Sequence, residues 1–208
     1  MIKNEKLMTK RIAVIASGRG SNFQAVINAI AARKIPAVCA ALITDNPKAY
    51  AIERAKKAHI PVRVIDYHSF PSREVYERAL FSAMQRLDPD LFVLAGYMRI
   101  VGNEIVRAFN GRMINIHPAL LPSFTGLHAQ QQAIVHGVKV AGCTVHFVDE
   151  SLDGGPIILQ HCVPVLDSDD EDTLAERILH YEHICLPEAI RLFCEERLVI
   201  DGRKVIVR

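Results

Sequence analysis

Two side chains that could stabilise a developing negative charge, an amide and an imidazole, stand two positions apart in the segment INIHPALLP. If this segment begins as a strand, its side chains alternate between two faces, so Asn115 and His117 would project on one side and Ile114 and Ile116 on the other. Pro118 biases His117 toward an extended backbone, which holds that presentation. Both polar groups could then donate hydrogen bonds to one oxyanion. The alternative is a buried asparagine and a core histidine that bond only the backbone.

A glycine-containing loop, SGRGSN at residues 17–22, follows the first apolar run of the chain. The amides at a helix N-terminus attract phosphate, and glycine lets the backbone turn tightly there. Gly18 and Gly20 match the dinucleotide-binding fingerprint, but Phe23 stands where its third glycine belongs. The loop therefore favours phosphate binding over a full dinucleotide site. A plain strand–helix connection would use the same glycines.

A carboxylate precedes two glycines in the segment DESLDGGPI. Such a loop can bring Asp153 close to another site, although a carboxylate in a turn is often only a turn residue. Further along, His180 and His183 have the spacing of a metal-binding pair on a helix, but the sequence shows no third ligand. We interpret the isolated histidines as structural; they are His136, His146 and His161.

The composition excludes some classes of function. The formal net charge of +2 offers no electrostatic footprint for nucleic acid. The five cysteines are an odd number without a Cys-x-x-Cys pair, which indicates reduced thiols and not a disulfide framework or a zinc site. The chain opens without the pattern of a signal peptide and has no run of ~18 apolar residues. We expect no membrane span and a cytoplasmic protein.

The elements that must position these groups follow a repeating pattern. Short apolar strands alternate with amphipathic helices, which predicts a Rossmann-like α/β fold with a mostly parallel sheet and helices on both faces. The expected strands are residues 11–17, 36–45, 61–66, 90–96, 113–117, 142–148 and 156–165. The expected helices are 21–34, opened by a Ser/Asn cap, 49–59, 73–88 and 171–196, and an edge hairpin follows at 197–208.

This pattern predicts a single domain over residues 11–208, preceded by a flexible or disordered extension at residues 1–10. The half at residues 11–112 would bind a nucleotide phosphate. The half at residues 113–208 would carry the folate and catalytic groups that the resemblance described next implies.

Taken in order along the chain, these features resemble the phosphoribosylglycinamide formyltransferases, enzymes that use 10-formyltetrahydrofolate in purine synthesis. The resemblance runs from residue 11 to the end of the long helix, through SGRGSN, LAGYMRI, INIHPALLP, GLH, HFVDESLDGGPIILQ and YEH. Asn115, His117 and Asp153 match the catalytic triad of enzymes that use this folate. Ser123 and Thr125 depart from the family's usual residues in the intervening loop.

The resemblance also implies two binding sites and no metal. One site holds the ribonucleotide, with its phosphate on Gly20, Ser21 and Asn22 and the far wall of its pocket on Leu179, His180, Tyr181 and Glu182. The other site holds the folate, on Arg73, Met98, Arg99, Ile100, Val101, Asn115, Asp149, Glu150, Ser151, Leu152 and Asp153.

The implied reaction moves the formyl group of 10-formyltetrahydrofolate to the amine of glycinamide ribonucleotide. Asn115 and a protonated His117 would stabilise the oxyanion, while Asp153 supports the charged ring and orders a water for proton transfer to the departing folate nitrogen. The alternatives are a formyltetrahydrofolate hydrolase, a non-catalytic nucleotide-binding module and an NAD-dependent oxidoreductase. We expect small-molecule partners only, and the sequence allows a homodimer.

Overall fold

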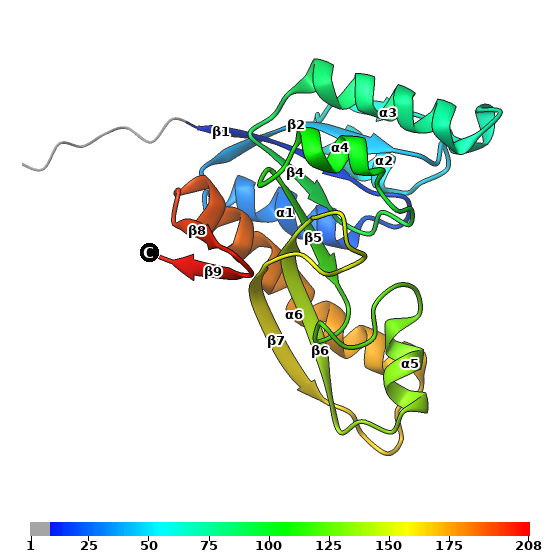
Figure 1. Cartoon of the computed structure of the whole chain (residues 1–208), viewed down its shortest axis with the longest axis vertical. Helices are drawn as coiled ribbons and strands as arrows, with labels where there is room; N and C mark the ends of the chain where they lie inside the picture. Colours follow the sequence, from blue (N-terminus) through cyan, green and yellow to red (C-terminus); the bar gives the residue numbers. More distant parts are fainter. Residues whose placement is uncertain (1–8) are drawn as a thin grey trace, which may run out of the picture.

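The computed structural model describes residues 9–208 (Figure 1). Its elements in chain order are β1 (Lys10–Ile15), α1 (Ser21–Ala31), β2 (Ala37–Thr44), α2 (Ala51–Lys57), β3 (Val62–Val64), the 3-10 helix η1 (Tyr67–Ser69), α3 (Arg73–Leu87), β4 (Leu91–Leu94), α4 (Asn103–Ala108), β5 (Met113–His117), α5 (Ala129–Val135), β6 (Val140–Phe147), β7 (Ile157–Pro164), α6 (Glu171–Cys194), β8 (Leu198–Asp201) and β9 (Lys204–Val207).

One sheet runs through the chain in the order β3-β2-β1-β4-β5-β6-β7-β9-β8. The strands from β3 to β5 pair in parallel, whereas β6 joins β5 and β7 in antiparallel fashion. The hairpin of β8 and β9 closes the far edge, where β9 pairs with β7. The predicted α/β fold with a mostly parallel sheet is therefore confirmed, and so is the terminal hairpin.

Helices cover both faces of the sheet, and the strands carry apolar side chains toward each face. In β1, Ile12 and Val14 pack in one core with α1, α2, α5 and α6. Ala13 and Ile15 pack in the second core, with α3 and α4, which lie above the parallel strands in Figure 1. Burial on both faces explains why such strands read as continuous apolar runs instead of alternating ones.

Some expectations differ from the structure. β1 begins at Lys10, so the expected extension reaches one residue too far; its residues 1–8 lie outside the described part of the chain. Helix α1 has Gly20 as its N-cap, in a left-handed conformation and with no side-chain cap, so the expected Ser/Asn cap was wrong. The short helices α4 and α5 were not predicted.

The parallel strands all end at the same edge of the sheet, and the loops that leave them are bonded to each other. Ser17, after β1, donates its N–H to the Gly96 carbonyl after β4 at 3.0 Å, and its Oγ accepts from Met98 N–H at 3.0 Å. Asn46, after β2, donates its side-chain amide to the Ser17 carbonyl at 3.1 Å. This edge is where ligands bind in open α/β sheets. Across residues 9–208, no helix is long and apolar enough to cross a bilayer.

Candidate active site

The amide and imidazole of the INIHP segment project from one face of β5, as strand alternation predicts. Ile114 and Ile116 both pack in the core with α1 and α6, so Asn115 and His117 point to the opposite face. The His117 side chain is almost fully buried at the end of the strand. Asn115 and His117 therefore lie near the carboxyl ends of the parallel strands, the edge where open α/β sheets generally bind ligands.

Both ring nitrogens of His117 face an acceptor oxygen. Nδ1 lies 3.5 Å from Asp153 Oδ2, and Nε2 donates to the Phe124 carbonyl at 2.8 Å. A protonated imidazole has two N–H groups, and both would be satisfied in this position. At 3.5 Å, the contact with Asp153 is longer than a tight hydrogen bond.

Asp153 reaches this position because its loop passes very close to the end of β6. The residue itself has a positive φ of 51°, and a Cβ at Gly155 would overlap the Phe147 carbonyl oxygen. Only glycine allows that approach. The Asp153 carboxylate also accepts the Gly126 N–H at 2.8 Å, which joins the loop to the segment after β5.

His146, on β6, contacts the candidate site residue Asn115, a contact that the sequence analysis did not predict. It pairs with Asn115 across the two strands, and Asn115 Nδ2 donates to its Nε2 at 3.3 Å. Its Nδ1 donates to the Phe147 carbonyl at 2.8 Å, so in the neutral ring Nε2 is the acceptor. Burial lowers the pKa of His146, which favours this neutral form. The β5–β6 register is the signal that reveals the contact of His146 with Asn115.

The SGRGSN loop turns sharply into α1 and leaves its amides free. Gly20 has a φ of 68°, and a Cβ there would lie 2.8 Å from the Ala51 Cβ. Within the described residues, the backbone N–H groups of residues 18–23 donate to no protein acceptor. Amides presented in this way at a helix N-terminus suit an anion.

A buried carboxylate lies directly beside this loop. Asn22 Nδ2 donates to Glu182 Oε2 at 2.7 Å, and both side chains are more than nine-tenths buried. Burial raises the pKa of Glu182, and the hydrogen bond from Asn22 opposes that shift. The Asn22 Oδ1 atom is buried without a partner.

The other residues predicted on α6 face different surroundings. Leu179 is half-buried, His180 is exposed, and Tyr181 stacks on His161 with ring centroids 3.7 Å apart. No hydrogen bond joins these three to Gly20, Ser21 or Asn22 in the part of the chain described. Residues 9–208 contain no cluster of three or more histidine, cysteine or acidic side chains arranged for a metal ion.

The segment predicted to hold the folate follows β4. Arg99 is fixed by Asp45, with 2.5 Å between Nε and Oδ2, and its guanidinium lies 3.4 Å from the centroid of the Tyr67 ring. Met98 and Ile100 expose 61% and 59% of their surfaces, whereas Val101 is buried. Exposed apolar side chains on a fixed backbone can accept an apolar ring.

The second predicted folate segment is the loop at residues 149–153. Asp149 accepts hydrogen bonds from the Ser151 N–H and hydroxyl, and Leu152 is exposed. Glu150 forms a two-point ion pair with Arg107 of α4, at 2.9 and 2.7 Å.

Arg73, the remaining predicted contact, lies in the first turn of α3 and bonds Glu77 at 2.7 Å. Among the described residues, no hydrogen bond or ion pair joins Arg73 to the other predicted folate residues.

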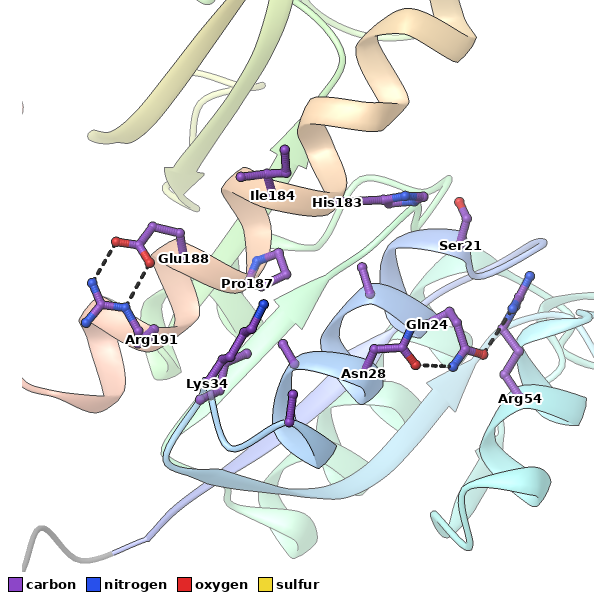
Figure 2. Close-up of a pocket in the computed structure, with 14 residues that line it drawn as sticks. Ser21, Gln24, Asn28, Lys34, Arg54, His183, Ile184, Pro187, Glu188 and Arg191 are labelled. Atoms are coloured by element: carbon purple, nitrogen blue, oxygen red, sulfur yellow. Dashed lines mark hydrogen bonds and ion pairs between the residues drawn. The ribbon is translucent and has the colours of Figure 1, made fainter.

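A groove of about 830 Å³ lies between α1 and α6 and does not contain the triad (Figure 2). Ser21, Arg54 and His183 line the end next to the SGRGSN loop, and Lys34 and Arg191 line the other end. Asn115 and His117, the groups able to stabilise an oxyanion, are on β5 and do not line this groove.

Comparisons with known proteins identify the family of the chain. The formyl transferase family matches residues 10–190. The chain is 42% identical to the phosphoribosylglycinamide formyltransferase of Bacillus subtilis, over 88% of this chain and 93% of that protein. A crystal structure of glycinamide ribonucleotide transformylase 1 from Symbiobacterium toebii is 50% identical, with a TM-score of 0.93, and covers 96% of this chain and 94% of that one.

Two further similar proteins differ from this chain in length or in identity. The chain is 47% identical to the trifunctional purine biosynthetic protein adenosine-3 of Drosophila pseudoobscura, over 91% of this chain but only 14% of that protein's length. A formyltetrahydrofolate deformylase structure from Pseudomonas syringae is 27% identical, with a TM-score of 0.89, over 96% of this chain and 66% of that one. The match over residues 10–190 and the near-complete coverage of the bacterial relatives lead to one conclusion: the chain belongs to the formyl transferase family, among its phosphoribosylglycinamide formyltransferases.

Proposed function

We propose that this enzyme transfers the formyl group of 10-formyltetrahydrofolate to the amine of glycinamide ribonucleotide, giving formylglycinamide ribonucleotide and tetrahydrofolate. The observation that carries the proposal is the pairing of His117 with Asp153 on the same sheet edge as a loop of free amides. The names of the bacterial relatives support the choice of acceptor.

The ribonucleotide would bind where α1 begins. Its phosphate would accept hydrogen bonds from the amides of Gly20, Ser21 and Asn22, since these have no protein acceptor among the described residues. Glu182 would accept hydrogen bonds from the sugar hydroxyls or the amine. Leu179, His180 and Tyr181 would line the rest of the pocket.

The folate would bind on the two segments that expose apolar side chains. Met98, Ile100 and Leu152 would contact its rings, since each exposes more than half of its surface. Polar edges of the ring system would bond the backbone of residues 99–101 and 149–153. The Arg73 guanidinium would exchange Glu77 for a carboxylate of the folate tail, because both are anionic acceptors.

In the reaction, the substrate amine attacks the formyl carbon and negative charge grows on the formyl oxygen. Asn115 Nδ2 has a second N–H, beyond the one given to His146, and this N–H would donate to that oxygen. The His117 ring would stabilise the oxygen through its positive charge, because both of its N–H groups already face protein acceptors. Asp153 would hold the imidazolium and order the water that carries a proton from the attacking amine to the leaving folate nitrogen. No step requires a metal.

A formyltetrahydrofolate hydrolase is the second candidate, because the deformylase structure shares this fold. Its lower identity, 27% against 50% for the transformylase structure, makes it the weaker choice. We also propose that the enzyme works in the cytoplasm and can form a homodimer. Residues 11–112 would hold the nucleotide phosphate and residues 113–208 the catalytic groups, while each binding pocket takes side chains from both halves.

The test is to mix purified protein with 10-formyltetrahydrofolate, with and without glycinamide ribonucleotide, and to follow the folate product. We expect rapid turnover only when the ribonucleotide is present. Equal turnover without it would assign the enzyme to the hydrolases, and no turnover in either mixture would contradict both candidates.

A further inference from the structure

We propose that Arg54 of α2 is a positioning and charge-supplying residue of the phosphate loop, additional to Gly20, Ser21 and Asn22. The inference rests on the proposed function, because it concerns how the same loop holds an anionic substrate. Figure 2 shows Arg54 reaching toward the start of α1, at the end of the groove where Ser21 and His183 lie.

The first contact fixes the orientation of a loop amide. Arg54 Nε donates to the Arg19 carbonyl oxygen at 2.9 Å. In a trans peptide the C=O and the following N–H point in opposite directions. Because the Arg19 carbonyl is turned toward Arg54, the Gly20 N–H is turned away from it, and this N–H has no protein acceptor among the described residues. Arg54 thereby prepares one of the donors that the phosphate would use.

The second contact holds the guanidinium against the first turn of α1. Arg54 Nη1 donates to Gln24 Oε1 at 3.0 Å, and Gln24 in turn donates to Asn28 at 2.9 Å. The Arg54 Cδ lies 3.6 Å from where a Cβ of Gly20 would be. The side chain is therefore packed beside the loop and held by hydrogen bonds to the loop at Arg19 and to the first turn of α1 at Gln24.

The charge of Arg54 is not neutralised by the protein. Within residues 9–208, no carboxylate lies within 4.0 Å of its guanidinium; Glu53, its neighbour in sequence, pairs with Lys56 at 2.8 Å. Helix α1 has no acidic residue in its first turn. After burial and His180, the charge on Arg54 is a further cause that lowers the pKa of His183, on the facing helix. A phosphate dianion would thus meet a full positive charge in addition to the helix dipole.

The alternative is that Arg54 only braces α2 against the loop. A structural residue and a charge-supplying residue differ in what their loss does to phosphate affinity, to the salt dependence of that affinity and to the KM for the folate. Arg54→Met removes the charge and both hydrogen bonds while keeping the apolar stem. Arg54→Lys keeps the charge but cannot bond Arg19 and Gln24 together in the same fork. Lys57→Met is the matched control, because it removes a charge from the exposed end of the same helix.

The experiment measures the affinity of the full chain for ribose 5-phosphate by calorimetry at two salt concentrations, the KM for each substrate, and Tm. For Arg54→Met we expect affinity for ribose 5-phosphate and for glycinamide ribonucleotide to fall by about tenfold or more, with an unchanged KM for the folate. The salt dependence of binding should be shallower than in the wild type. Arg54→Lys should recover part of the loss, and Lys57→Met should resemble the wild type.

Wild-type affinity in Arg54→Met would overturn the inference while leaving the proposed function intact. Equal losses of affinity for both substrates, together with a lowered Tm, would mean that Arg54 has only a structural role in packing α2 against the loop. Failure of the wild type itself to bind ribose 5-phosphate would contradict the phosphate site of the proposed function as well. If Arg54→Met does not fold, the test rests on Arg54→Lys. Wild-type affinity for ribose 5-phosphate, together with an unchanged Gly20 amide resonance, in that variant would exclude positioning of the loop by the two guanidinium hydrogen bonds.

Discussion

The side chain of Asn22 donates a hydrogen bond to Glu182 across 160 positions of sequence, and it does so in a buried environment. Asn22 belongs to the first turn of α1, and Glu182 to the middle of α6. Burial raises the pKa of Glu182 above its ordinary 4.5. An ionised carboxylate at this position therefore costs stability, and ribonucleotide binding is the role that we propose for it.

Glu182→Gln should raise stability and lower affinity. In the wild type, the folded carboxyl holds its proton more tightly than the unfolded one, so stability falls as pH rises above the unfolded value of 4.5. Glutamine does not titrate and can still accept from Asn22. We expect Tm of the variant to equal or exceed that of the wild type at pH ~7, with the difference vanishing near pH ~4.5. The KM for glycinamide ribonucleotide should rise about tenfold.

The control is Glu196→Gln, an exposed carboxylate that pairs with Lys10. It should leave both KM values unchanged. A Glu182→Gln variant that is less stable at neutral pH and binds the ribonucleotide normally would mean that Glu182 is a structural residue.

Gly20→Ala should damage the phosphate loop, whereas Gly18→Ala should not. Gly20 has a left-handed φ of 68°, and its Cβ would lie 2.8 Å from the Ala51 Cβ. A Cβ at Gly18 has nothing within 4 Å. For Gly20→Ala we expect a free energy of unfolding lower by about 1–2 kcal/mol or more, measured by urea denaturation. The KM for the ribonucleotide should rise more than that for the folate, and similar behaviour of both variants would argue against a specialised loop.

Asp153→Asn and His117→Ala should each lower kcat by about 10²–10³, because each removes support for the developing oxyanion. Their side chains face each other at 3.5 Å, so the double variant should lose little more than either single variant. Single-turnover rates of all three variants provide the measurement. Asp167→Asn, an exposed carboxylate paired with Lys139, is the control. Rate losses that multiply in the double variant would show that the two residues act independently.

Protonation of His146 should remove the acceptor that orients the Asn115 side-chain amide. Burial lowers the pKa of His146 below 6.5, while Asp153 and Asp149 oppose that shift and His117 adds to it. The neutral ring therefore contributes stability that is present above pH ~6.5 and is lost as pH falls through the lower folded value. Once Nε2 carries a proton, it can no longer accept from Asn115.

His146→Gln should retain more activity than His146→Leu, because an amide oxygen can still accept from Asn115. It should also remove the contribution of His146 to the loss of rate in acid. Profiles of kcat against pH for the three proteins measure this. Full activity in His146→Leu would exclude a role in orienting Asn115.

The long elements were predictable because their patterns are strong. β5 was predicted with its observed ends, and α3 and α6 to within two residues of their last positions. The missed helices, α4 and α5, have six and seven residues, so each offers little of an amphipathic period. Helix α2 is equally short, with seven residues, and was predicted only as a longer helix at 49–59. Helix α5 also begins after a His128 in the left-handed conformation, without a capping side chain to mark its start.

From strand and helix patterns alone, the candidate site was predictable only as far as local sequence carries it; the family resemblance was needed to group Asp153 with His117 and Glu182 with Asn22. Strand alternation was enough to place Asn115 and His117 on one face. The contact of His146 with Asn115 depends on the register between β5 and β6, and the position of Glu182 beside Asn22 depends on how α6 crosses α1. Both are tertiary contacts between different elements, which no pattern within one element predicts. The contact of Arg54 with the Arg19 carbonyl is of the same kind.

The position of β5 in the sheet has a consequence for which genetic changes this chain can tolerate. The strand is hydrogen-bonded on both sides, in parallel to β4 and antiparallel to β6. Removing or adding one residue inside it would turn Asn115 and His117 into the apolar core and bring isoleucines to the reacting groups. Single-residue insertions and deletions within 113–117 should therefore abolish activity even in variants that still fold. Changes of length in the exposed turn around Gly137 should leave Asn115 and His117 on their observed face of β5. That turn lies between elements and has open space around it.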